Sequence, residues 1–175
     1  TLKNDVTTIK SNITTLKSEV NGIINKIKKC IIIGDSYAEG YTPDGNVTSW
    51  AQLLKNSLTN KYDEIAINAL GGTGFIYNDT VKSSFLTLLT QISISDPENV
   101  TDIIVCGGYN DTGNPVETVT EKVGEFCAYA KSKYPNAIVS IGMIGADMNN
   151  KDKTIFLIES VGRGYANCGK FANAR

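Results

Sequence analysis

The sequence contains no histidine among its 175 residues. Histidine is the usual general base for a serine nucleophile and the commonest metal-binding side chain. Cysteine is also sparse: Cys30, Cys106, Cys127 and Cys168 lie far apart, without a C-x-x-C pair. These two absences exclude the ordinary zinc sites. We therefore expect no metal and no cofactor, and we expect the cysteines to be buried free thiols.

The sequence also lacks a strong charge of either sign and any long apolar run. The formal net charge is −1, so there is no basic surface to attract nucleic acid. No apolar run approaches the roughly 18 residues that span a bilayer, and no secretory signal opens the chain. We expect neither a nucleic-acid partner nor a membrane partner. The chain starts with Thr1, not Met, so we expect it to be a piece of a longer protein.

Residues 1–28 carry a strict heptad pattern. The seam is Leu2, Val6, Ile9, Ile13, Leu16, Val20, Ile23 and Ile27, spaced alternately by four and three residues. A 3.5-residue repeat predicts a coiled coil, and isoleucine at both core positions favours three strands over two. We therefore predict a parallel trimeric stalk and a homotrimer assembled through residues 1–28. The alternative is an amphipathic helix folded back on its own domain.

Residues 29–175 alternate between short β-branched runs and helical patterns. The runs at 30–34, 64–69, 102–108 and 137–143 predict buried parallel strands. Helical patterns follow them, with Thr48 and Ser49 as cap candidates and Asn114-Pro115 expected to be N-cap and first residue. A last helix is predicted from about Asp152, with Ile158, Val161, Tyr165, Cys168 and Ala172 on one face. The fold class is therefore α/β, a doubly wound sheet between helices.

Three loops should meet at the carboxyl ends of these strands, where such folds bind ligands. The loop at 34–47 contains Gly34-Asp35-Ser36, the loop at 70–80 contains "GGTG", and the loop at 108–115 contains "GYND". Acyl transfer needs a hydroxyl nucleophile and several N–H donors for the oxyanion. A serine, a glycine amide and an asparagine side chain supply that set.

These three motifs resemble blocks I, II and III of the SGNH (GDSL-type) hydrolase superfamily over about residues 30–145. The resemblance implies a three-layer α/β/α sandwich on a five-stranded parallel sheet that is flavodoxin-like in order. It also implies Ser36 as nucleophile and oxyanion amide, Gly72 as oxyanion amide, and Asn110 as oxyanion side chain. Gly71 or Gly74 takes the place of Gly72 if the second block is shifted.

The chain departs from that family in its fourth motif. The family's D-x-x-H block, which carries the general base and its orienting acid, is absent, and only four of five strands are present. We expect a C-terminally truncated SGNH domain over 29–175, inactive or nearly so by itself. A degenerate full-length domain is the alternative. Asp147 is a weak substitute base, because a carboxylate is a poor base for a serine hydroxyl.

The resemblance implies a serine ester hydrolase, and we expect it to remove O-acetyl groups from carbohydrate or to cleave another small ester. A stalked trimer suggests a phage tail or baseplate fibre or a bacterial surface appendage, so we expect an extracellular, virion or cell-surface location. The alternative is a non-catalytic glycan-binding or assembly module. A flavodoxin-like nucleotide binder is weaker, since neither G-x-x-x-x-G-K-[ST] nor G-x-G-x-x-G occurs.

Overall fold

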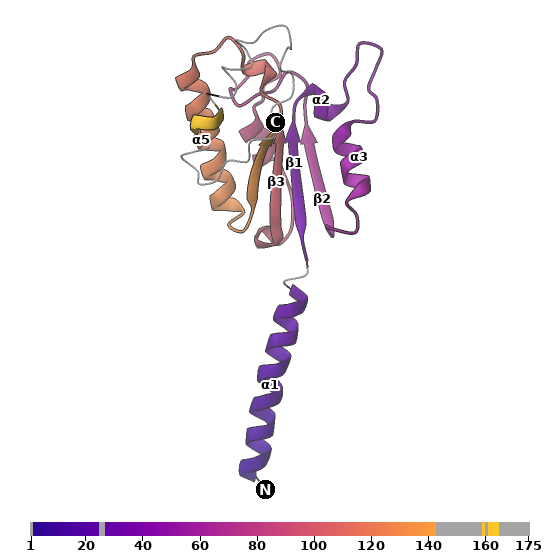
Figure 1. Cartoon of the computed structure of the whole chain (residues 1–175), viewed down its shortest axis with the longest axis vertical. Coiled ribbons are helices and arrows are strands. Elements are labelled where there is room, and N and C mark those ends of the chain that lie inside the picture. The colour runs from indigo at the N-terminus through magenta and orange to yellow at the C-terminus, as the bar shows by residue number, and fades with distance from the viewer. Residues whose placement is uncertain (1, 25–26, 143–158, 160, 165–175) are drawn as a thin grey trace.

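The structure is a computed structural model, and it describes residues 2–24, 27–142, 159 and 161–164. A long helix, α1 (Leu2–Ile24), precedes an α/β domain that begins with β1 (Lys29–Gly34). The helix extends away from the domain, with the N-terminus at its far end (Figure 1). Residues 4–22 are all exposed. The helix is therefore not folded back on its own domain. None of the described helices is long and apolar enough to cross a membrane.

The domain is built on a parallel sheet, as predicted. Its strands are β1, β2 (Glu64–Ala69), β3 (Val100–Cys106) and β4 (Ile138–Gly142), in the order β2-β1-β3-β4. This order is the flavodoxin-like one, and it brings the three predicted loops to one edge of the sheet (Figure 1). Strand β3 starts and ends two residues earlier than predicted. It ends there because Gly107 and Gly108, with φ of 156° and 107°, leave the strand conformation.

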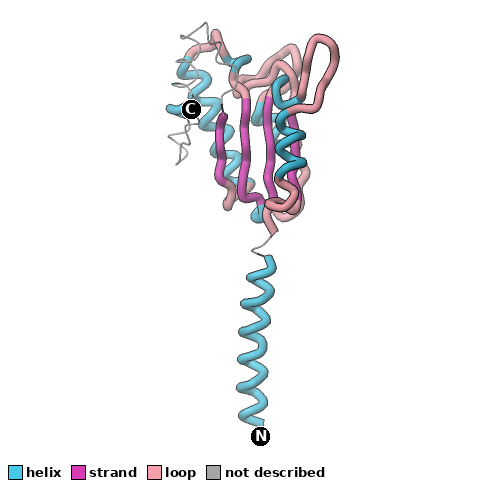
Figure 2. The backbone as a smooth tube through the Cα atoms, turned by 45° about the vertical axis from the view of Figure 1, so that its right-hand side comes forward, coloured by secondary structure: helices cyan, strands magenta, loops and turns pink. Residues whose placement is uncertain are grey.

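Helices cover both faces of the sheet (Figure 2). The short α2 (Ser36–Glu39) and α3 (Trp50–Ser57) lie on one side, and α4 (Phe85–Thr90) and α5 (Val116–Lys133) pack on the other. The Ser49 hydroxyl accepts a hydrogen bond from the N–H of Gln52 at 3.1 Å, which confirms the predicted cap of α3. These layers are the predicted α/β/α sandwich.

The start of α5 was predicted one residue too early. The helix begins at Val116, and Pro115, with ψ of 138°, is the N-cap without a side-chain bond. The Asn114 side chain points back instead and donates to the carbonyl of Asp111 at 3.1 Å. The expected cap at Asn114 is therefore wrong, because its amide is used within the preceding loop.

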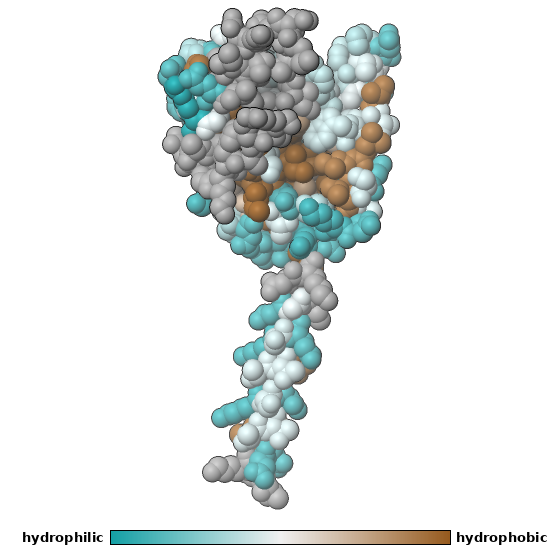
Figure 3. Space-filling view, in the orientation of Figure 1, coloured by the Kyte–Doolittle hydropathy of each residue, from teal (hydrophilic) through white to brown (hydrophobic). Residues whose placement is uncertain are grey.

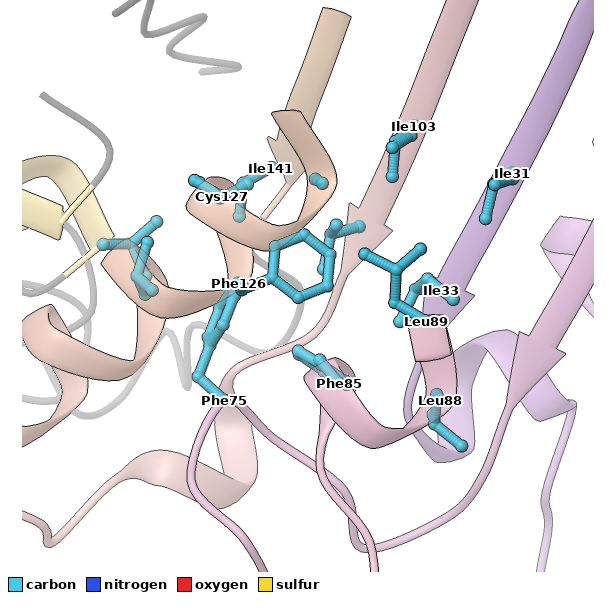
Figure 4. Packing of buried hydrophobic residues seen from close by; sticks show 14 of the residues in the cluster. Ile31, Ile33, Phe75, Phe85, Leu88, Leu89, Ile103, Phe126, Cys127 and Ile141 are labelled. Atoms are coloured by element: carbon cyan, nitrogen blue, oxygen red, sulfur yellow. The ribbon is translucent and has the colours of Figure 1, made fainter. Parts of the chain in front are cut away.

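The main core lies between the sheet and the α4–α5 layer. Phe75 packs edge-to-face on Phe85 and Phe126, with ring centroids 5.0 and 5.8 Å apart (Figure 4). Ile31 and Ile33 of β1 are fully buried in the same cluster. Each such side chain contributes about 1.5–3 kcal/mol through burial. This cluster fixes the strand ends that carry the loops.

The opposite face is only partly covered by described residues. Helix α3 packs over Cys30, Ile32 and Ile65. Towards β4 the same face carries Ile104 and Ile138, and Ile138 is 62% exposed. Figure 3 shows apolar side chains gathered across the middle of the domain.

A buried lysine marks the opposite end of the sheet, where α1 joins β1. The Lys29 ammonium donates to the carbonyl and hydroxyl oxygens of Ser95 at 2.8 and 2.7 Å. It also pairs with Glu64 at 3.1 Å and Asp96 at 3.5 Å. A buried charge requires such partners, so the base of β1 is fixed to two neighbouring segments.

The predicted last helix is described in part. Residues 161–164 are helical, and Val161 is buried in the main core as expected. The other predicted members of its apolar face, and the substitute base Asp147, lie outside the described residues.

Candidate active site

The sequence places Ser36 on a turn that is fixed from both sides. A Cβ on Gly34 would lie 2.3 Å from the Cβ of Ala38 and 2.9 Å from the carbonyl oxygen of Cys106, so only glycine fits there. Asp35 caps α2 by accepting a hydrogen bond from the N–H of Tyr37 at 3.0 Å. Ser36 is therefore the first residue of α2, half-buried at the carboxyl end of the central strand.

Two backbone N–H groups near this turn are unpaired. Within the described residues, no group accepts a hydrogen bond from the N–H of Ser36 or of Gly72. Buried and half-buried N–H groups are normally paired, so two free donors on adjoining loops suit an anion that forms during a reaction. Gly72 has φ of +79°, a left-handed conformation that glycine adopts without strain.

The geometry distinguishes Gly72 from the other two candidate glycines. Gly71 adjoins Ser36, since a Cβ built on it would lie 3.5 Å from the Cβ of Ser36. Its N–H, however, donates to a Glu39 carboxylate oxygen at 2.7 Å. Gly74 packs on the carboxylate of Asp111, where a Cβ would lie only 2.4 Å from Oδ1. Of the three, Gly72 combines an unpaired N–H group with a position directly after Gly71, which adjoins Ser36.

Asn110 connects the second and third loops. It lies in η2 (Tyr109–Asp111), and its Nδ2 donates to the carbonyl of Thr73 at 2.8 Å. An asparagine amide carries two N–H donors, so one remains for a ligand. Gly72 and Asn110 line one hollow of about 310 Å³, whereas Ser36 does not line it. The structure thus brings Gly72 and Asn110 together directly, and Ser36 adjoins them through Gly71.

Two carboxylates with structural roles at this site were missed from the sequence. Asp111 is buried and accepts hydrogen bonds from the N–H groups of Phe75 and Ile76, both at 2.9 Å. Burial raises the pKa of Asp111, and the two hydrogen bonds oppose that rise. Glu39, which holds Gly71, lies one turn after Ser36. The local pattern offered no signal for either, because each partner is more than thirty residues away.

Asp35, directly before Ser36, is a buried carboxyl group with a raised pKa. It is fully buried, and its Oδ2 has no hydrogen-bond partner among the described residues. Burial raises the pKa of Asp35 to about 6, with a further contribution from the nearby Asp111. A Cβ on Gly107 would lie 2.8 Å from this oxygen, so glycine is required there as well.

The Ser36 hydroxyl itself has no hydrogen-bond partner among the described residues. This agrees with a chain that contains no histidine to act as its base. Neither Cys30 nor Cys106 is suited to act as a nucleophile instead, since burial raises the pKa of each thiol to about 12. Cys30 and Cys127 are buried, as expected, Cys106 is half-buried, and Cys168 lies outside the described residues. In the part of the chain that the structure describes, no cluster of potential ligands is suited to a metal ion.

No protein-family model and no curated protein sequence matches the chain. Solved structures do match its fold. A family two carbohydrate esterase from Cellvibrio japonicus is 17% identical with a TM-score of 0.60, covering 83% of this chain and 51% of that one. An acetyl xylan esterase from Butyrivibrio proteoclasticus is 18% identical with a TM-score of 0.55, covering 83% and 55%.

A smaller neighbour is covered more completely. It is a chain from Bacteroides ovatus assigned to the GDSL-like lipases, 19% identical with a TM-score of 0.58, with 81% of this chain and 82% of that chain covered. The structures that share this fold therefore include esterases and lipases of the SGNH type, carbohydrate esterases among them. This chain spans about half the length of the carbohydrate esterases that it matches.

Proposed function

We propose that the domain is an SGNH-type serine ester hydrolase. In the proposed reaction, the Ser36 oxygen forms a bond to the acyl carbon of an ester, and the alcohol leaves with a proton. Water then attacks the acyl-serine and releases the acid. The observation that carries the proposal is the pair of unpaired N–H groups, of Ser36 and Gly72, with the free Asn110 donor close to Gly72. Donors positioned in advance stabilise the oxyanion in the transition state.

The proposed substrate is an O-acetylated carbohydrate. The matched carbohydrate esterases support this class through the shared fold alone. The 175-residue chain has no histidine, and losing the base of a serine hydrolase costs on the order of 10⁶ in kcat. By itself the chain should therefore hydrolyse esters very slowly or not at all.

We further propose that α1 assembles the domain into a parallel trimer. The exposed fractions of Val6, Ile9, Ile13, Leu16 and Val20 lie between 46% and 57%. A helix with this aliphatic seam and little else to stabilise it needs partner helices to cover the seam. Such a stalk suits a phage tail, baseplate or cell-surface fibre, which would place the domain outside the cell.

The chemical test supplies the missing base. Imidazole added to the 175-residue chain should restore cleavage of p-nitrophenyl acetate and of an acetylated sugar, to at least about tenfold above Ser36→Ala. The Ser36→Ala variant measures the direct reaction of imidazole with the ester. Equal rates for the two proteins at every imidazole concentration would remove Ser36 from the mechanism.

A non-catalytic glycan-binding module is the second candidate, and the absence of histidine favours it. Binding of glycan that persists in Ser36→Ala, with no turnover by the longest natural chain containing these residues, would select this alternative.

A further inference from the structure

The hollow beside Gly72 and Asn110 has a rigid polar wall. Its volume is about 310 Å³, and the segment from Ile76 to Thr80 forms one side. Asn78 holds this segment in place: its Nδ2 donates to the carbonyl of Gly72 at 2.8 Å, and its Oδ1 accepts from the N–H of Thr80 at 2.8 Å. An antiparallel bridge between Asn78 and Ser83 closes the loop behind it. The wall is therefore preorganised against the proposed oxyanion site.

The hollow offers hydrogen-bond acceptors as well as donors, which suits the hydroxyl groups of a sugar. Asn110 and Asn114 each donate one amide N–H to a backbone carbonyl, so each keeps a side-chain oxygen as an acceptor and a second N–H as a donor. The carboxylate of Asp79 is exposed and has no partner among the described residues. Sugar hydroxyl groups are donors of the kind that such oxygens bind.

One aromatic ring and the local charge narrow the class of ligand further. Tyr77 lines the hollow with half of its surface exposed, at 50%. An exposed aromatic face is a platform for the C–H face of a sugar ring. Asp79 contributes a negative charge, and among the described residues no lysine or arginine lines the hollow. The site should therefore disfavour sugars that carry a carboxylate.

We propose that this hollow is the subsite for the sugar of the ester, and that it selects neutral over acidic saccharides. The inference rests on the proposed function, because it places the alcohol part of the substrate next to Gly72 and Asn110. Tyr77 packs on the sugar ring, and Asp79 and the two asparagines accept hydrogen bonds from its hydroxyl groups.

The experiment measures binding, so that it is independent of turnover. Saturation-transfer NMR and calorimetry would use the Ser36→Ala chain with neutral xylo-, chito- and manno-trisaccharides and with trigalacturonate. We expect at least one neutral trisaccharide to bind and trigalacturonate to bind at least about tenfold more weakly. Tyr77→Ala should weaken neutral binding by about tenfold. Asp79→Asn should reduce the discrimination against trigalacturonate.

Tyr41→Ala is the matched control, since Tyr41 is 61% exposed and does not line the hollow. It should leave binding unchanged, and circular dichroism checks the fold of each variant. The proposal is overturned if no neutral trisaccharide binds, if trigalacturonate binds as tightly, or if folded Tyr77→Ala and Asp79→Asn have no effect. If imidazole does not restore hydrolysis but the sugars still bind, the enzymatic proposal is rejected and the hollow is supported as a sugar-binding site.

Discussion

At the scale of residues, the site is held together by carboxylates, not by the residues expected to perform the chemistry. Glu39 connects the turn of Ser36 to Gly71, and Asp111 connects the third loop to Phe75 and Ile76. All three hydrogen bonds are charge-assisted, and each spans more than thirty residues of sequence. The relative position of Ser36 and Gly72 therefore depends on side chains that need not touch a substrate.

Removing the Glu39 carboxylate should destabilise this loop pairing. Glu39→Ala leaves the N–H of Gly71 unpaired, so we expect the free energy of unfolding to fall by about 1.5–3 kcal/mol. Glu39→Gln keeps an oxygen acceptor and should lose less than half of that amount. Urea unfolding of the three proteins provides the measurement, and equal stability of all three would contradict the role of this bond.

The buried Asp35 predicts an unusual pH dependence. Its pKa is about 6 in the folded protein against 3.8 for the ordinary side chain, so the folded state favours the protonated form. Its contribution to stability is complete below about pH 4, and it is lost as pH rises through about 6. An asparagine side chain at this position cannot ionise. The stability of Asp35→Asn relative to wild type should therefore increase by on the order of 3 kcal/mol between pH 4 and pH 7.

Thermal or urea unfolding of both proteins at several pH values measures that difference. The comparison with wild type removes the contribution of the other carboxylates. A difference that stays constant across this range would show that Asp35 ionises normally.

At the scale of elements, we expect α1 to need other helices for its stability. Its described residues 4–22 are exposed, and between its aliphatic residues lie mostly Thr, Asn, Ser and Lys, several of them mediocre helix formers. Three of its threonines, Thr8, Thr14 and Thr15, use their hydroxyls to bond the carbonyl four residues earlier, which competes weakly with helix formation. Burial of the seam must offset these costs.

A single polar substitution in the seam should dissociate the assembly. In sedimentation equilibrium at micromolar concentration, we expect the 175-residue chain to be a trimer and Ile13→Asn to shift strongly towards monomer. Thr15→Asn, off the seam on the same helix, should remain trimeric. A chain that starts at Lys29 should be monomeric. A monomeric 175-residue chain would contradict the stalk.

Elements were easier to predict than the contacts between them. The parallel strands could be read from short runs such as Ile31–Ile33, because strands buried on both faces are continuously apolar. The boundary at Pro115 was missed, because it depends on Asn114 bonding back to Asp111. Ser36, Gly72 and Asn110 could be proposed as site residues because their motifs end predicted strands. The hydrogen bonds of Glu39 and Asp111 could not be predicted, since only the folded chain brings their partners close.

At the scale of the whole molecule, the stalk and the proposed site lie at opposite ends of β1. Helix α1 approaches the start of β1 at Lys29, and Ser36 follows its end. The three loops gather at the far edge of the sheet (Figure 1). A ligand held there would be presented away from the stalk, at the outer end of the fibre that we propose.

The central position of β1 has a mechanical consequence. This strand is paired along its whole length with β2 on one side and β3 on the other. The stalk runs roughly in line with it (Figure 1). A force applied between the stalk and a ligand held at the far edge therefore acts along the strands. It loads the hydrogen bonds between β1 and β2 and between β1 and β3 in shear, so that these bonds share the load instead of breaking one after another. We expect the domain to resist unfolding under such a force.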